Sequence, residues 1–548
     1  MGKGWNFVLI SAILCIANAE SVRHKIFPTP QEFSEGENVL TFDACEFDIK
    51  HNQEKAPIDV NPIIKKYKSR IFGKILDCPS YFLSKRVLEI QIPTLIQEYF
   101  PAKIEDTDES YSLKITETEI ILSANQYSGL VHGLETFSRL IKPSDNGKYV
   151  IENVPITIQD IPRFSYRGIM IDTARHFIGA QSIMRVIDGM AMAKLNVLHW
   201  HIVDDDSFPM ESLSFPSLAN YTAFSLLQTY LKEEIQSIVS YANTNAIRII
   251  PEFDNPGHTR SLGLDPSFNP LVTCFNTHWP YSMPSGPKIQ GGPPTGALDP
   301  SNSTTYSLIA GIFQDLNFYF PDSYVHLGGD EVIFSCWSSV PAIVQFMQQN
   351  KIQTYQALMN YYINKARGVL TSVNSTKTAL YWLNEATFYL QVKSTDILEY
   401  WGLSANISKL ATLYPNNKIV IAPSDVYYMD CGMGNPYGGI SWCDPYHSWW
   451  SIYLLEPTQY LSANQILGGE VPMWAELVND WNIDGKIWPR AAGLAERYWS
   501  QNSKVNVPSL VTSLNSLIVA MNAQGIGASP ITGHYCEING SFCFSTPS

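Results

Sequence analysis

Eight short apolar segments lie between residues 167 and 474, and longer stretches of helical character separate them. This alternation is typical of parallel β/α units, in which a helix follows each strand and returns the chain to the next one. The expected strands are 167–172, 196–203, 247–254, 324–330, 378–382, 397–401, 418–423 and 465–474. Eight such units predict an α/β fold whose sheet closes as a (β/α)8 TIM barrel.

An open, doubly wound parallel sheet is the alternative arrangement of the same elements. It would call for a glycine-rich, phosphate-binding turn after the first strand. That turn reads Asp172-Thr-Ala-Arg175 and contains no glycine, so the closed barrel is the favoured prediction.

The chain before the barrel divides into two parts. Lys3, an apolar stretch over residues 7–16 and the small residues of Ala17-Asn-Ala19 have the order of a secretory signal peptide, which predicts cleavage after residue 19. Residues 20–163 mix alternating and helical patterns, which predicts a smaller α+β domain that ends near Asp160-Ile-Pro-Arg163. The barrel domain is then expected over residues 164–548.

A signal peptide predicts the secretory pathway, with a lysosomal or a secreted destination. No later stretch reaches the roughly 18 apolar residues that a membrane-spanning helix requires, so no membrane span is expected. Loss of Cys15 with the signal leaves an even number of cysteines, as a disulfide framework in an oxidising compartment would have. The sequons fit the same route, with acceptors at Asn220, Asn302, Asn374, Asn406 and Asn539.

The charge balance excludes some partners. The chain has 37 basic and 51 acidic residues, a formal net charge of −14. Such a surface would not attract nucleic acid or an anionic membrane. Aromatic residues make up 12% of the chain and offer flat faces for stacking against sugar rings, although most buried indoles serve the core.

Polar and aromatic residues follow all eight expected strands. The carboxyl ends of barrel strands meet on one face, so these residues are expected to line one pocket. In strand order they are Arg175 and His176; His201, Asp204 and Asp205; Glu252, Asp254 and His258; Asp330 and Glu331; Trp382; Trp401; Tyr428 and Asp430; and Trp474 and Glu476. Carboxylates and an arginine suit the hydroxyls of a pyranose sugar, and indoles suit its ring face.

A metal site is the competing use for His201, Asp204, Asp254 and His258. No His-X-X-X-His spacing or similar ligand pattern is present, and carboxylate–histidine pairs also tune proton transfer. We therefore expect no metal and no other cofactor.

The adjacent acids Asp330 and Glu331 follow two glycines at the end of the fourth expected strand. Paired acids in a loop are commonly solvated charges or the cap and first turn of a helix. Their place among the other strand ends favours a catalytic pair instead.

Five motifs, in this order, resemble those of the family 20 glycoside hydrolases, the β-N-acetylhexosaminidases. They are Arg167-Gly-Ile-Met-Ile-Asp-Thr-Ala-Arg-His176, Leu198-His-Trp-His-Ile-Val-Asp-Asp205, Pro251-Glu-Phe-Asp-Asn-Pro-Gly-His258, His326-Leu-Gly-Gly-Asp-Glu331 and Trp488-Pro-Arg-Ala-Ala-Gly-Leu-Ala-Glu-Arg497. A further motif, Tyr427-Tyr-Met-Asp-Cys-Gly432, is more similar to the fungal and insect chitin-processing branch than to the mammalian lysosomal branch.

The resemblance implies hydrolysis of terminal, non-reducing N-acetylhexosamine (GlcNAc or GalNAc) from β-linked glycans and chitooligosaccharides. In this family the substrate's own 2-acetamido oxygen attacks the anomeric carbon, which gives an oxazolinium intermediate and retention of configuration. Glu331 is then the expected general acid and base. Asp330 would orient the acetamido N–H and balance the charge of the intermediate, and Tyr428 would bond the acetamido carbonyl.

The resemblance also implies roles for the other pocket residues. The indoles expected to enclose the acetamido methyl group and exclude water are Trp382, Trp401 and Trp474. The polar residues expected to bind the hydroxyls of the terminal sugar are Arg175, Asp430 and Glu476. Trp442 is the candidate platform for the next sugar. The residues expected to support Glu331 by hydrogen bonding are Asp204, His258 and Asp254.

The resemblance places Asp430 beside C6 of the terminal sugar, which would make this position anionic, and the motif around Asp430 carries no cation. A sulfate brought close to this carboxylate would be repelled, which predicts a preference for neutral substrates.

Two other functional classes remain as alternatives. A carbohydrate-binding paralogue with little turnover would be marked by a substituted acid, whereas Asp330 and Glu331 are both present. A retaining glycosidase with a protein nucleophile would need another carboxylate opposite Glu331, and Glu252 and Glu476 are the candidates. In every case the partner is a glycan, and the oligomeric state is left open, a homodimer included.

The resemblance implies a set of disulfide bonds as well. The implied pairs are Cys274 with Cys336, Cys431 with Cys443, and Cys536 with Cys543. This leaves Cys45 to pair with Cys78 inside the N-terminal domain.

Overall fold

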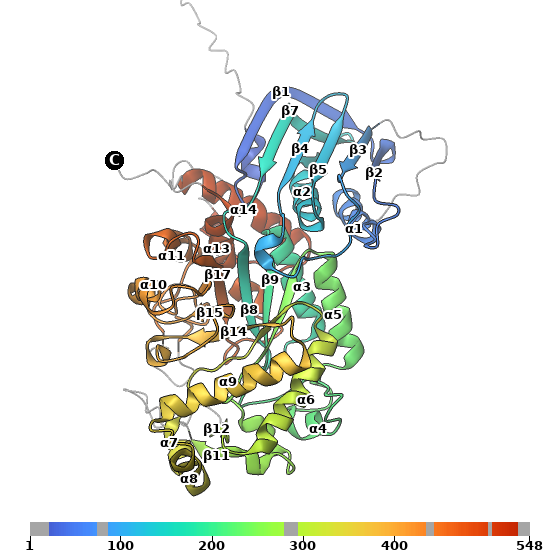
Figure 1. The fold of residues 1–548 in the computed structure, drawn as a ribbon. Coiled ribbons are helices and arrows are strands. Elements are labelled where there is room, and N and C mark those ends of the chain that lie inside the picture. The colour runs from blue at the N-terminus through green and yellow to red at the C-terminus, as the bar shows by residue number, and fades with distance from the viewer. Residues whose placement is uncertain (1–20, 74–85, 279–293, 435–442, 502–506, 535–548) are drawn as a thin grey trace, which may run out of the picture.

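The computed structural model describes residues 21–73, 86–278, 294–434, 443–501 and 507–534. An N-terminal domain sits on one end of a larger barrel domain (Figure 1). The expected signal peptide, residues 1–19, lies outside the described residues.

The N-terminal domain is a mixed sheet with helices packed against it. Its strands are β1 (Glu32–Phe42), β2 (Phe47–His51), β3 (Arg86–Gln91), β4 (Tyr111–Ile115), β5 (Ile120–Ala124), β6 (Ile141–Pro143) and β7 (Tyr149–Asp160), and its helices are α1 (Asn61–Phe72) and α2 (Tyr127–Leu140). The strand order is β1-β7-β4-β5-β3-β2, with β6 paired to β7. This confirms the smaller domain that the mixed patterns predict.

The barrel is closed by eight parallel strands in the order β8-β9-β10-β13-β14-β15-β16-β17. They are β8 (Tyr166–Asp172), β9 (Val197–Val203), β10 (Arg248–Phe253), β13 (Tyr324–His326), β14 (Thr378–Leu383), β15 (Ile397–Tyr400), β16 (Ile419–Ile421) and β17 (Ile466–Met473). The predicted TIM barrel is thus confirmed, with every expected strand in its place.

Helices surround this barrel (Figure 1). They are α3 (Ala180–Met192), α4 (Leu218–Thr222), α5 (Lys232–Thr244), α6 (Ser303–Tyr319), α7 (Phe334–Ser338), α8 (Pro341–Gln349), α9 (Tyr355–Val373), α10 (Leu410–Leu413), α11 (Trp449–Leu454), α12 (Ile483–Ile487), α13 (Arg490–Trp499) and α14 (Val507–Ala523). A two-stranded sheet, β11 (Val272–His278) with β12 (Pro294–Leu298), lies beyond β10. Within the described ranges, no helix combines the length and the apolar character needed to cross a bilayer.

The fourth barrel strand is shorter than the sequence predicts. It ends at His326, whereas the apolar run suggested a strand to residue 330. Gly328 and Gly329 have φ angles of 61° and 96°, in the left-handed region that a strand does not use and that favours glycine. The chain therefore turns sharply just before the acid pair.

The N-terminal domain closes one end of the barrel. Ile104 lies in an apolar layer with Tyr166, Val197 and Tyr324, which stand at the first residues of their strands. The backbone N–H of Ile104 also donates to the Tyr324 hydroxyl at 2.9 Å. Since this end of the barrel is filled, the end that remains for a ligand of the barrel is the one at the carboxyl ends of the strands.

Buried charged side chains join the two domains. Arg167 of β8, fully buried, pairs with Glu109 of the N-terminal domain at 2.5 Å, and His132 lies 2.8 Å from the same carboxylate. Lys194, also fully buried, pairs with Asp160 at 3.0 Å. Burial would raise the pKa of Glu109, but Arg167 and His132 lower it to about 2.

The disulfide bonds agree with the pairs that the resemblance implies, where the structure describes both partners. Cys274 is joined to Cys336 and Cys431 to Cys443. Cys45 is disulfide-bonded, and its expected partner lies outside the described residues. The cysteines outside the described residues are Cys78, Cys536 and Cys543.

The sequon asparagines inside the described residues lie at the surface. Asn220 is exposed, and Asn302, Asn374 and Asn406 are half-buried. Asn539 lies outside the described residues.

Glu109→Ala should destabilise the protein strongly. The change leaves Arg167 buried without its partner, at a cost of about 3 to 5 kcal/mol. The control is Glu119→Ala, which removes the partner of Lys114 from a pair whose side chains are 55% and 44% exposed and should cost about 1 kcal/mol or less. Urea unfolding of both variants checks this, and equal shifts of the midpoint would contradict it.

Candidate active site

The acid pair lies directly after the β13 turn, at the carboxyl ends of the strands. Asp330 is buried, with 8% of its surface exposed, whereas Glu331 keeps 34% of its side chain exposed. Two backbone contacts fix the turn: the Gly329 N–H donates to Asp254 Oδ1 at 2.9 Å, and the Trp382 N–H donates to the Gly328 carbonyl at 3.0 Å. The turn thus presents one acid to the interior and one to the pocket.

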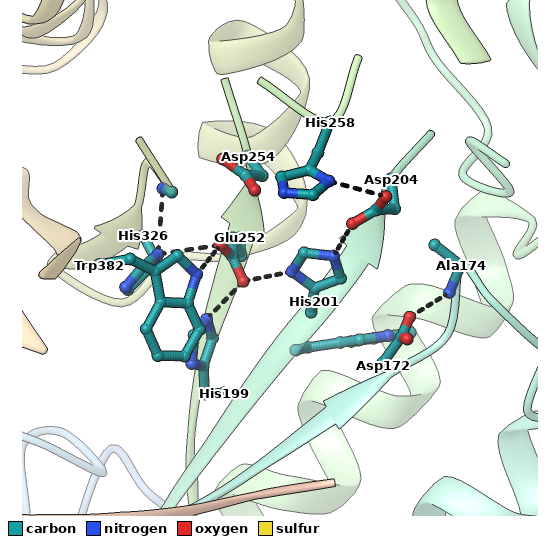
Figure 2. Close-up of polar contacts among 12 residues, drawn as sticks. Asp172, Ala174, His199, His201, Asp204, Glu252, Asp254, His258, His326 and Trp382 are labelled. Carbon is teal, nitrogen blue, oxygen red and sulfur yellow. Dashed lines mark hydrogen bonds and ion pairs between the residues drawn. The ribbon is translucent and has the colours of Figure 1, made fainter. Parts of the chain in front are cut away.

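A chain of alternating carboxylates and imidazoles runs from Glu331 into the barrel, and Figure 2 shows most of it. His258 Nε2 lies 3.4 Å from Glu331 Oε2, and His258 Nδ1 lies 3.3 Å from Asp204 Oδ1. The other Asp204 oxygen contacts His201 Nε2 at 2.8 Å, and His201 Nδ1 contacts Glu252 Oε2 at 2.5 Å. Side chains on strands β9 and β10, together with side chains that follow β9, β10 and β13, therefore form one connected relay.

The charges in this relay are mutually stabilised. Burial opposes a charge on His258, but the Asp204 carboxylate raises the pKa of His258 well above its usual value. Burial would raise the pKa of Asp204, yet Arg175 and His258 hold it well below its usual range. The arrangement is that of an imidazolium between two carboxylates.

The same cluster has the spacing of a possible metal site. Asp204, Asp205 and His258 bring one ligand atom each within 4.8 Å of one another. A protonated imidazole has no lone pair for a metal, however, and the Arg175 guanidinium already lies 2.9 Å from Asp204. The donor set therefore suits proton transfer better than a bound cation.

Arg175 is surrounded by carboxylates and an indole of the site. Its guanidinium pairs with Asp172 at 3.3 Å and with Asp204 at 2.9 Å, and it stacks over the Trp474 ring at 4.8 Å. Glu476, which is exposed, interacts electrostatically with Arg175 as well. The arginine is thus held rigidly at the pocket edge.

The three predicted indoles and Tyr428 come together as one aromatic wall. The ring centroids of Trp382 and Trp474 are 6.0 Å apart, and those of Tyr428 and Trp474 are 6.5 Å apart. Trp401 stacks on Tyr428 with 6.4 Å between centroids and 28° between the ring planes. Trp382 is fully buried and therefore lies at the inner end of this wall.

Asp330 faces this wall without a fixed cationic partner of the kind that Asp204 has. Burial raises the pKa of Asp330 to about 7, and the charge of Glu331 adds to that effect, while His258 opposes it. Burial together with the charge of Asp330 also raises the pKa of Tyr428 well above its usual value. The pocket floor is therefore a place where negative charge is poorly compensated.

Asp430 follows β16 and immediately precedes Cys431, which is disulfide-bonded to Cys443. The buried side chain of Arg490 interacts electrostatically with Asp430. The sequence around Arg490 did not predict this interaction. The motif around Asp430 contains no cation, but the fold brings the Arg490 side chain near this carboxylate. Trp442, the candidate platform for the next sugar, lies outside the described residues.

Two acids of the site did not stand out in the sequence. Asp172 accepts from the N–H groups of Ala174 and Ala475, at 2.9 and 3.1 Å, and Asp206 lies 3.6 Å from the Arg175 side chain. The spacing of three residues between Asp172 and Arg175 was the available signal for the first. Burial raises the pKa of Asp206 to about 7.

Glu252 cannot be the protein nucleophile that one alternative required. It is 1% exposed, and Trp382 Nε1 donates to its Oε1 at 2.6 Å. With the indole between it and the pocket, this carboxylate supports the wall from behind.

Comparison with known protein families agrees with this geometry. The family model described as "Glycosyl hydrolase family 20, catalytic domain" matches residues 164–502. A second model, described as "beta-acetyl hexosaminidase like", matches residues 26–140.

Individual relatives cover most of the chain. The β-hexosaminidase subunit β of Felis catus is 34% identical over 79% of this chain and 77% of its own. The β-hexosaminidase of Emericella nidulans is 33% identical over 78% of this chain and 76% of its own. The solved β-N-acetylhexosaminidase of Streptomyces coelicolor A3(2) has the same fold, with a TM-score of 0.72 at 22% identity over 94% of this chain and 99% of its own. The first two identities are nearly equal, so overall similarity does not separate the fungal from the mammalian branch.

Asp330→Asn should stabilise the fold at neutral pH and not in acid. The pKa of Asp330 is about 7 in the folded protein and near 3.8 in the unfolded chain, so wild type loses stability as the pH rises from about 4 to about 7. At about 1.4 kcal/mol per pH unit, the variant gains up to about 4 kcal/mol at pH 8 and almost nothing at pH 4.

Urea unfolding at both pH values measures this gain. Asp145→Asn, at an exposed turn residue, is the control and should change stability by about 0.5 kcal/mol or less at either pH. A gain for Asp330→Asn that is the same at pH 4 and pH 8 would rule out the proposed cost of its charge.

Proposed function

We propose a division of roles among the pocket residues that starts from one premise: the chain belongs to glycosyl hydrolase family 20. It is a β-hexosaminidase, which hydrolyses terminal GlcNAc and GalNAc residues from glycans. Members of this family use the substrate's acetamido group as the nucleophile, so the protein must supply an acid, a group that stabilises the oxazolinium ion, and a closed acetamido pocket.

Glu331 is the general acid and base in this proposal. It is the more exposed of the two acids, and His258 lies 3.4 Å from its carboxylate. This contact carries the assignment, because a cationic imidazole linked to Asp204 can hold Glu331 in place and pair with its carboxylate once the leaving oxygen has taken the proton.

Asp330 orients the acetamido N–H and balances the developing positive charge. Its burial supports this role, since a carboxylate in a poorly compensated site gains most when a cation forms beside it. Tyr428 would donate to the acetamido carbonyl. Trp382, Trp401 and Trp474 would keep water from the acetamido group so that the internal oxygen stays in attack geometry.

Recognition of the terminal sugar falls to Arg175, Asp430 and Glu476 in this proposal. Arg175 is held by Asp172 and Asp204, at 3.3 and 2.9 Å, which leaves its position little freedom. A rigid guanidinium suits the directional hydrogen bonds that distinguish one hydroxyl from another. Neutral GlcNAc-ended oligomers such as chitooligosaccharides are the substrates that we favour.

The disulfides and the relatives fit a protein of the secretory pathway, and we propose a lysosomal or secreted location for it. We also propose domain boundaries at residues 20–163 and 164–548. The alternative of a catalytically weak carbohydrate-binding paralogue draws no support from the site, because both acids and the relay behind them are intact.

Glu331→Gln should lose far more activity on substrates with poor leaving groups than on nitrophenyl GlcNAc. A nitrophenolate leaves with little protonation, so the difference between the two losses should be on the order of 100-fold or more. Values of kcat/KM for a series of aryl GlcNAc substrates measure it. Asp330→Asn is the matched comparison and should slow all N-acetylated substrates alike; the same pattern in both variants would remove Glu331 from the role of acid.

Asp430→Asn should relax a preference for uncharged sugars. A sulfate within about 4 Å of the Asp430 carboxylate is repelled by about 1 kcal/mol or more, partly offset by Arg490, so wild type should prefer aryl GlcNAc over its 6-sulfate by about fivefold or more. The ratio of kcat/KM values should fall in the variant. Asp425→Asn, an exposed residue of the same loop, is the control, and an unchanged ratio in Asp430→Asn would refute charge selection by this residue.

A further inference from the structure

Glu252 is a carboxylate that contacts both the aromatic wall, through Trp382, and the proton relay, through His201. We propose that Glu252 is a positioning residue: it holds the indole of Trp382 and the imidazole of His201 together, and so aligns the acetamido wall and the acid catalyst as one unit. This inference rests on the function proposed above. It assigns Glu252 no contact with the substrate.

The two oxygens of Glu252 serve different parts of the site. Oε1 accepts from Trp382 Nε1 at 2.6 Å, and Oε2 accepts from His201 Nδ1 at 2.5 Å (Figure 2). A third group, His199 Nε2, lies 3.0 Å from Oε2. The two carboxylate oxygens are thus held by donors on different strands. Trp382, which binds Oε1, is on β14, and the two histidines near Oε2 are on β9.

The burial and charge of Glu252 support a rigid role. The residue is 1% exposed, and its surroundings leave no route to a sugar. Burial would raise the pKa of Glu252, but the imidazoles of His201 and His199 hold it well below its usual value. A buried anion that accepts two short, charge-assisted or indole hydrogen bonds resists displacement.

His326 does not add a further donor. The Gly328 N–H donates to its Nδ1 at 3.1 Å, so this nitrogen is an acceptor, although it lies 3.2 Å from Glu252 Oε1. Burial lowers the pKa of His326 to about 4, in keeping with a neutral ring. Oε1 of Glu252 therefore depends on the indole of Trp382.

The proposal makes the Glu252→Gln variant informative. An amide keeps the shape of the side chain but has one acceptor oxygen in place of two, and its NH2 group would face the donors on one side. One side must lose its hydrogen bond, and the loss of charge weakens the imidazolium of His201 as well. Both the wall and the relay should therefore suffer from this one change.

Glu399 provides a matched control in the same barrel interior. It is fully buried on β15, and its closest contacts to His199 and His326 are both 3.7 Å. Burial and the charge of Glu470 raise the pKa of Glu399 well above its usual value, which favours the neutral carboxyl. Glu399→Gln therefore exchanges one uncharged group for another of similar shape. Among the described residues, no hydrogen bond or ion pair joins the Glu399 side chain to Trp382 or His201.

The experiment measures two quantities in each variant: the dependence of kcat/KM on the leaving group across aryl GlcNAc substrates, and the Ki of a thiazoline that mimics the bicyclic intermediate. Glu252→Gln should show a steeper leaving-group dependence and a Ki raised by about 10- to 100-fold. Glu399→Gln should stay within about threefold of wild type in both. A variant that merely folds less well would lose active enzyme without changing either quantity.

Two further variants separate the effect on the aromatic wall from the effect on the proton relay. Trp382→Phe removes the indole N–H and should weaken thiazoline binding with an unchanged leaving-group dependence, whereas Asp204→Asn should do the reverse. Should Glu252→Gln fail to fold, Glu252→Asp retains the charge but cannot span both partners, and it should show both defects in weaker form.

The results test the role of Glu252 separately from the assignment of Glu331 as the acid. Only one defect in the Glu252 variants, or the same small effects as in Glu399→Gln, would overturn the coupling role of Glu252. A normal leaving-group dependence in Glu331→Gln would instead overturn the assignment of the acid, whatever the Glu252 variants do.

Discussion

A charge inside a protein is tolerated only when opposite charges or hydrogen-bond donors surround it, and this constraint shapes the barrel interior. Carboxylates and imidazoles alternate from the middle of the barrel to its carboxyl end. The series is Glu470, His199, Glu252, His201, Asp204, His258 and Glu331. Because each member stabilises the next, the position of the last carboxylate depends on all those beneath it.

Asp330 lies beside this balanced series but has no equivalent place in it. Burial, only partly offset by His258, keeps the carboxylate costly, with a pKa of about 7, until a further positive charge forms beside it. An oxazolinium ion formed in the pocket would supply that charge. Under the proposed roles, the unfavourable charge of Asp330 in the resting enzyme would be relieved as the reaction proceeds, which is the sense in which a preorganised site stabilises a transition state.

Periodicity and motifs were sufficient to predict the eight strands of this barrel and many of the side chains that the structure brings together at their carboxyl ends, because each strand end carries its own polar or aromatic signal. They were insufficient for contacts between strands. The link from Glu252 to Trp382 joins β10 to β14, and Arg490 approaches Asp430 from a helix 60 residues along the chain. The early end of β13 also escaped prediction, because Leu327 continues the apolar run past the last residue that pairs in the sheet.

The buried charges between the domains have a consequence for synthesis on the ribosome. Glu109 and Asp160 emerge before Arg167 and Lys194, their partners in the barrel. The N-terminal domain therefore waits for the first two barrel strands before its carboxylates are neutralised, and those strands cannot close into a barrel until β17 is made. We expect both domains to complete folding in one late, cooperative step. Until then, much of the nascent chain is accessible to chaperones.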